Sequence, residues 1–145
     1  MGSAARLPVL LCSEDNNSFG EKDAMAQAIP RELTPVLIVD DDEQILELTA
    51  EVVRRLGYWP ITARNGFEAL DSLRKHPEIR VLFSDIRMPG MDGEQLADAA
   101  LSLQPKLRII LTSGTRPPRR AVDFVPKPYR AADLIRALPP QPLRH

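Results

Sequence analysis

The side chains that could do chemistry stand directly after short apolar runs in this 145-residue chain. Continuous apolar runs of this length are typical of parallel strands that are buried on both faces. Open parallel sheets bind their ligands outside the carboxyl ends of the strands. We therefore expect the following side chains to meet at one edge of a sheet: Asp40, Asp41, Asp85, Thr112, Ser113 and Lys127.

Three carboxylates gathered at such an edge, from Asp40, Asp41 and Asp85, would repel one another. Two like unit charges about 4 Å apart cost about 4 kcal/mol at an effective dielectric constant near 20, so a proton or a cation has to offset the repulsion. Carboxylate oxygens without histidine or cysteine suit Mg²⁺, which keeps several of its waters. The pattern predicts a site for magnesium and a phosphoryl group, with Mg²⁺ and Lys127 as the counter-charges.

Hydrophobic periodicity predicts alternating strands and helices from Val36 onward. The expected strands are 36–39, 58–63, 81–84, 107–111 and 122–125, and the expected helices are 45–56, 67–73, 96–103 and 131–138. This alternation predicts an α/β fold with a parallel sheet between two layers of helices. Residues 114–121 are short for a parallel crossover and include Pro117 and Pro118, so we expect a loop or a single turn there in place of a fourth helix.

Four stretches resemble the signature sequences of bacterial response-regulator receiver domains. They are residues 36–43, 84–93, 111–113 and 124–128, they occur in the family's order, and the resemblance covers about residues 36–138. It implies a flavodoxin-like, doubly wound five-stranded parallel sheet with strand order 2-1-3-4-5, in the short variant whose fourth helix is reduced or absent. It also implies a signalling protein of a two-component or phosphorelay system, not an enzyme beyond its own Mg²⁺-dependent phosphorylation and dephosphorylation.

The resemblance further implies the acceptor and the metal ligands. Asp85 would take a phosphoryl group from a histidine kinase or a histidine phosphotransfer protein. Asp41, Asp85 and the backbone carbonyl of Arg87 would ligate Mg²⁺, and Asp40 would act mainly through water. The phosphorylated protein would then act on a downstream protein target.

The remaining site positions are also carried over from the resemblance. Lys127 would pair with a phosphoryl oxygen, while Thr112 and Ser113 would bind the phosphoryl group as part of the switch. Phe124 would be the aromatic residue that moves with Thr112, and the Lys127–Pro128 peptide bond would be cis.

Other interpretations remain open at this stage. The chain could be a pseudo-receiver, a constitutive protein-interaction module that is never phosphorylated. A phosphatase of the aspartyl-phosphate class is a further alternative, although that class needs a longer chain with a cap. Asp42 and Glu43 are predicted to start a helix, and residues 92–93 to form a turn, without binding a ligand.

Composition excludes several classes of function. A net charge of -1 gives no basic field for nucleic acid, and no apolar run reaches the roughly 20 residues that cross a membrane. A single cysteine, Cys12, cannot form an internal disulfide, which fits a cytoplasmic protein. We expect a disordered tail over residues 1–33, the receiver over 34–139 and a short tail over 140–145.

Overall fold

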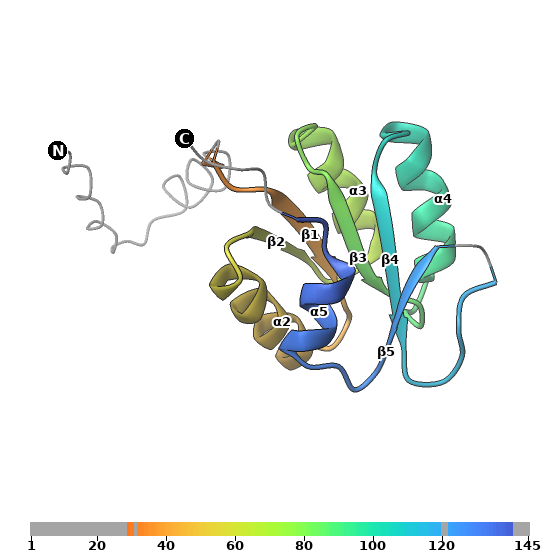
Figure 1. The fold of residues 1–145 in the computed structure, drawn as a ribbon. Coiled ribbons are helices and arrows are strands. Elements are labelled where there is room, and N and C mark those ends of the chain that lie inside the picture. Colours follow the sequence, from red (N-terminus) through yellow and green to blue (C-terminus); the bar gives the residue numbers. More distant parts are fainter. Residues whose placement is uncertain (1–28, 31, 120–121, 141–145) are drawn as a thin grey trace, which may run out of the picture.

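The computed structural model describes residues 29–30, 32–119 and 122–140. Within these residues, strands and helices alternate along the chain as far as β4, and β5 follows β4 without a helix between them (Figure 1). The elements are β1 (Pro35–Val39), α2 (Glu43–Arg55), β2 (Trp59–Ala63), α3 (Gly66–Lys75), β3 (Val81–Asp85), α4 (Gly93–Leu103), β4 (Arg108–Ser113), β5 (Asp123–Pro126) and α5 (Ala131–Ala137).

The five strands form one parallel sheet in the order β2-β1-β3-β4-β5, which confirms the predicted order. The strand register determines which side chains share an edge. Val39 lies opposite Ser84, and Asp85 lies opposite Thr112. The residue after Val39 is Asp40, so Asp40, Asp85 and Thr112 come from neighbouring strands at the same level of the sheet.

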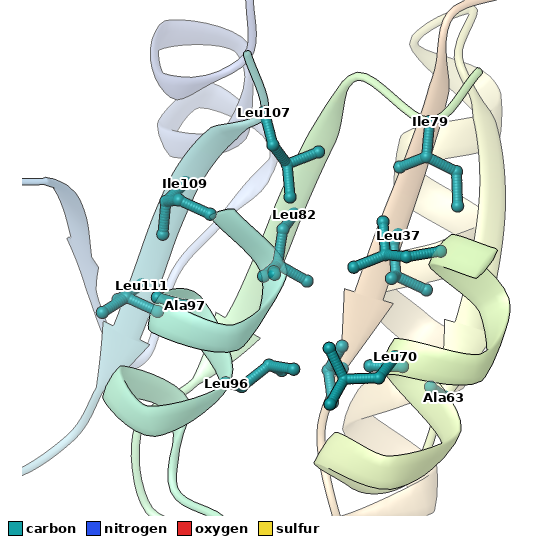
Figure 2. Close-up of a cluster of buried hydrophobic side chains, with 14 of the residues drawn as sticks. Leu37, Ala63, Leu70, Ile79, Leu82, Leu96, Ala97, Leu107, Ile109 and Leu111 are labelled. Carbon is teal, nitrogen blue, oxygen red and sulfur yellow. The ribbon is translucent and has the colours of Figure 1, made fainter. Parts of the chain in front are cut away.

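Two layers of helices cover the sheet, with α3 and α4 on one face and α2 and α5 on the other (Figure 1). Side chains of β1 alternate between the two faces, so Leu37 packs under α3 and α4 while Val36 and Ile38 pack under α2 and α5. Figure 2 shows side chains from β1, β3, β4 and both helices meeting in the first of these clusters. Full burial of such aliphatic side chains is worth roughly 1.5–3 kcal/mol each.

Helix starts are capped by aspartates that follow the strands. The Asp42 carboxylate accepts the backbone N–H groups of Gln44 and Ile45, at 3.0 and 3.3 Å, and so caps α2. This confirms the prediction that Asp42 starts a helix. Asp92, predicted to lie in a turn, is the N-cap of α4 and forms a reciprocal capping box with Gln95.

The connection from β4 to β5 contains no helix in its described residues 114–119 and 122, as Pro117 and Pro118 predicted. The strands around it differ slightly from the prediction. β4 continues through Thr112 and Ser113, and β5 runs one residue further, to Pro126. The polar ends belong to the strands because their backbones still pair across the sheet, and Pro126 is tolerated because β5 is an edge strand.

The predicted tails fall largely outside the described residues. Of the segment 1–33, only residues 29, 30, 32 and 33 are described, and of 140–145 only residue 140 is described. Cys12 lies outside as well. Where the chain is described, no helix is long and apolar enough to cross a bilayer.

Candidate functional site

Two carboxylates and an ammonium group meet at the carboxyl edge of the sheet. Lys127 Nζ lies 3.0 Å from Asp40 Oδ2, to which it donates a hydrogen bond, and 3.4 Å from Asp85 Oδ2. Asp40 is 3% exposed and Asp85 is 7% exposed, so both carboxylates are almost withdrawn from water. The sheet thus brings together three side chains that are distant in the sequence, since Asp40 and Lys127 are each at least 42 positions from Asp85.

A third carboxylate, from the exposed Asp41, completes an oxygen cluster. Asp40, Asp41 and Asp85 each offer an oxygen atom, and these atoms all lie within 4.8 Å of one another. Lys127 can balance only one of the three carboxylate charges, so the cluster retains an excess of negative charge when all three are ionised. Hard oxygen donors with uncompensated negative charge fit a hydrated Mg²⁺ ion.

Burial and charge act in opposite directions on the titration of this site. Burial raises the pKa of Asp85, and the nearby charge of Asp40 adds to the rise, while Lys127 and the backbone N–H of Arg87 oppose it. Burial alone would lower the pKa of Lys127, but the hydrogen bond to Asp40 and the charges of Asp40 and Asp85 outweigh it and raise the pKa. Lys127 therefore stays protonated at neutral pH.

Thr112 supplies a hydroxyl group with no partner. It lies opposite Asp85 in the sheet and is 1% exposed, and its Oγ1 makes no hydrogen bond with the described residues. Leaving a buried hydroxyl unpaired costs about 1–3 kcal/mol. An acceptor atom bound next to Asp85 would satisfy it.

Ser113, Phe124 and Pro128 are placed differently from Thr112. The Ser113 hydroxyl accepts the backbone N–H groups of Thr115 and Arg116, at 3.1 and 3.3 Å, so it is engaged with the loop after β4. Phe124 is partly buried and packs against the cluster under α3 and α4. The Lys127–Pro128 peptide bond is cis.

Three features next to the site were not predicted from the sequence. Gly93 starts α4 against the acceptor strand, because a Cβ there would lie 2.3 Å from the Asp85 carbonyl oxygen. Glu94 accepts hydrogen bonds from Arg116 Nη1 at 2.9 Å and from the backbone N–H of Arg119 at 3.0 Å, which holds the β4–β5 loop to α4. The third feature is a hydrogen bond between Thr49 and Tyr129.

The Glu94–Arg116 and Thr49–Tyr129 pairings could not be found from sequence spacing, because each joins segments that are distant along the chain. One sequence feature bears on the close approach of Gly93 to the Asp85 backbone, namely the Asp92–Gly93 step after a proline and a methionine. That step predicts only a turn.

Comparison with known proteins identifies the family. A family model described as the response regulator receiver domain matches residues 36–139. The chain belongs to this family. Its fold is the CheY-like, flavodoxin-like fold, and as a receiver it is a signalling domain of two-component systems.

Relatives of the receiver include both short and long proteins. It is 29% identical to the response regulator receiver protein CpdR of Brucella abortus, over 69% of this chain and 89% of that protein. It is 32% identical to the C4-dicarboxylate transport transcriptional regulatory protein DctD of Rhizobium meliloti, over 70% of this chain but only 24% of that protein. Chemotaxis protein CheY4 of Vibrio cholerae superposes with a TM-score of 0.67 at 27% identity, over 73% of this chain and 99% of that chain.

Proposed function

We propose that this receiver accepts a phosphoryl group on Asp85 from a phosphohistidine of a histidine kinase or a histidine phosphotransfer protein. The observation that carries the proposal is the buried Thr112 hydroxyl, which has no hydrogen-bond partner in the described part of the chain and lies opposite Asp85, an aspartate that Lys127 contacts. A phosphoryl group on Asp85 would bring strong acceptor oxygens close to the Thr112 hydroxyl and roughly -1.5 to -2 charges close to the Lys127 ammonium.

The transfer is a displacement at phosphorus. An Asp85 carboxylate oxygen attacks the phosphorus atom, the P–N bond of the phosphohistidine breaks, and its electron pair returns to the imidazole nitrogen. Asp85 has to be ionised to attack. Lys127 favours the ionised form and lies close enough to follow the charge from the carboxylate to the new phosphoryl oxygens.

The same carboxylates would hold Mg²⁺. Asp41, Asp85 and the Arg87 backbone carbonyl would be its ligands, with Asp40 acting through water. The close carboxylate oxygens of Asp40, Asp41 and Asp85 support a cation at this place. Bound Mg²⁺ would neutralise the charge on the transferring phosphoryl oxygens. Both carboxylate oxygens of Asp40 already accept hydrogen bonds, one from the backbone N–H of Asp42 at 2.9 Å and one from Lys127 Nζ at 3.0 Å.

Thr112 would report phosphorylation by donating its hydroxyl hydrogen to a phosphoryl oxygen, and Phe124 would follow the movement of β4. The Ser113 hydroxyl, already bonded to the loop, would transmit the shift of β4 into residues 114–119. Output then passes to a downstream protein by contact. We place the receiver at residues 34–139 and in the cytoplasm, where the kinase partner would reach it.

Incubation with acetyl phosphate and Mg²⁺, followed by intact-protein mass spectrometry, tests this function. The wild-type protein should gain one phosphoryl group, and the gain should disappear in Asp85→Asn and on chelation of Mg²⁺. Asp71→Asn, which changes an exposed aspartate paired with Lys75 on α3, should behave like the wild type. A wild-type protein that gains nothing, together with unchanged partner binding by Asp85→Asn, would instead favour a constitutive interaction module.

A further inference from the structure

We propose that Thr49 and Tyr129 are positioning residues that fix Lys127 over the acidic cluster. The inference deepens the proposed function and rests on it. The Thr49 Oγ1 and Tyr129 hydroxyl oxygens lie 2.7 Å apart, although the two residues are 80 positions apart in the sequence.

This hydrogen bond joins the helix that follows Asp40 and Asp41 to the segment that carries Lys127. Thr49 is 3% exposed and lies on α2, the helix that begins directly after the aspartates that follow β1. Tyr129 stands two residues after Lys127. One bond therefore connects the helix that follows Asp40 with the segment that bears the ammonium group.

A second contact fixes the Tyr129 ring from another side. The ring packs edge-on against Phe83 of β3, with ring centroids 5.4 Å apart and an interplanar angle of 85°. Phe83 lies two residues before Asp85 on the same strand. Tyr129 is thus held by the strand that carries the acceptor Asp85 and by the helix that follows Asp40.

One side of the lysine segment is not closely packed. Lys127, Pro128 and Tyr129 border a hollow of about 540 Å³ that lies between α2 and the β5–α5 connection. Because space on that side is open, the hydroxyl bond supplies a restraint that close packing would otherwise give. Burial raises the pKa of Tyr129, so the hydroxyl stays protonated at neutral pH.

Loss of the bond should misplace Lys127 without removing it. Small errors in the placement of a charged group cost large factors in rate, because the group must meet the phosphoryl oxygens as the transfer occurs. For Tyr129→Phe we expect the rate of phosphorylation by acetyl phosphate at saturating Mg²⁺ to fall by about fivefold to tenfold. Thr49→Val should cause a similar fall.

The double variant separates positioning from folding. Tyr129→Phe leaves the buried Thr49 hydroxyl unpaired and Thr49→Val leaves the partly buried Tyr129 hydroxyl unpaired, so each single variant should unfold more easily. Thr49→Val with Tyr129→Phe leaves an apolar pair and should recover most of the lost stability. If the bond positions Lys127, the double variant stays as slow as the single variants. If the pair serves folding alone, the rate recovers together with stability, and the proposal is overturned.

Tyr58→Phe is the matched control, since it removes another tyrosine hydroxyl, one that donates to the Pro139 carbonyl at the end of α5. It should lower stability and leave the phosphorylation rate unchanged. A wild-type rate in Tyr129→Phe would also contradict the proposal. Failure of the proposed function is distinct, because the wild-type protein itself would then gain no phosphoryl group.

Discussion

Thr112 and Lys127 can donate more hydrogen bonds than the acceptor atoms of the site accept. The Thr112 hydroxyl is buried without a partner among the described residues, while the Lys127 ammonium is divided between Asp40 and Asp85. A phosphoryl group on Asp85 would give the hydroxyl an acceptor and the ammonium a stronger counter-charge. The unphosphorylated state is therefore less stable locally than it could be, which is a useful property for a residue that reports modification.

Thr112→Val tests this property in the unphosphorylated protein. Valine keeps the shape and removes the unpaired hydroxyl, so the free energy of unfolding should rise by about 1 kcal/mol, as measured by urea denaturation. The same change should weaken any structural response to a phosphoryl analogue, because the donor is gone.

Thr49→Val provides the comparison, since the Thr49 hydroxyl is equally buried but hydrogen-bonded to Tyr129. It should lower the free energy of unfolding by about 1 kcal/mol. A loss of similar size in both valine variants would show that Thr112 has a partner in solution and would contradict the assignment.

Among the element connections, the one from β4 to β5 joins two strands without a helix in its described residues. In place of a helix, residues 114–119 form a loop that Ser113 holds at its start and Glu94 holds further along. Glu94 lies in the first turn of α4, and Gly93 of the same turn packs on the Asp85 backbone. The loop is thus linked to the acceptor through the start of α4.

The Glu94 link should make stability depend on pH in a defined direction. Hydrogen bonds from Arg116 and from the Arg119 backbone lower the pKa of Glu94 in the folded protein. Its stabilising effect is therefore complete above the unfolded pKa of about 4.3, and it is lost as the pH falls through the lower folded value. Glu94→Gln should lower the free energy of unfolding by up to about 1 kcal/mol at pH 7, and the difference should shrink below pH 4.

Chemical denaturation of both proteins between pH 7 and pH 3 measures this difference. Glu78→Gln, which changes an exposed glutamate before β3, is the control and should leave the free energy of unfolding at pH 7 unchanged. A Glu94→Gln difference that is the same at every pH would show that the link does not depend on the carboxylate charge.

The elements themselves could largely be predicted from the sequence, because their signals are local. The apolar runs before Asp40 and Asp85 predict strands buried on both faces, and β1 and β3 are such strands. The prolines after Gly114 predict a connection without a helix. Strand ends were less well predicted, since Ser113 and Pro126 pair through their backbones whatever their side chains.

Contacts between distant segments could not be predicted in this way. Nothing in the spacing of Thr49 and Tyr129 indicates that they meet, because the sheet order and the path of α2 bring them together. The Glu94–Arg116 ion pair depends in the same way on a loop whose path the sequence leaves open. At the strand ends, the polar side chains and the expected parallel sheet together predicted that the carboxylates and Lys127 would meet. The distances between them could be obtained only from the structure.

At the scale of the whole molecule, the receiver has its polar chemistry at one edge and apolar clusters on both faces of the sheet. A rigid, buried sheet can hold three carboxylates close together because the energy of both clusters opposes their repulsion. Binding of a cation and a phosphoryl group at that edge should therefore reach Thr112, Lys127 and the loop after β4 through the strands.

Amide NMR during a titration with beryllofluoride, a phosphoryl analogue, tests the central claim most directly. With Mg²⁺ present, we expect the amide signals of Asp85, Thr112 and Lys127 to shift, and we expect no such shift without Mg²⁺ or in Asp85→Asn. Signals that shift equally in Asp85→Asn, or that do not require Mg²⁺, would contradict a phosphoryl and metal site at these strand ends.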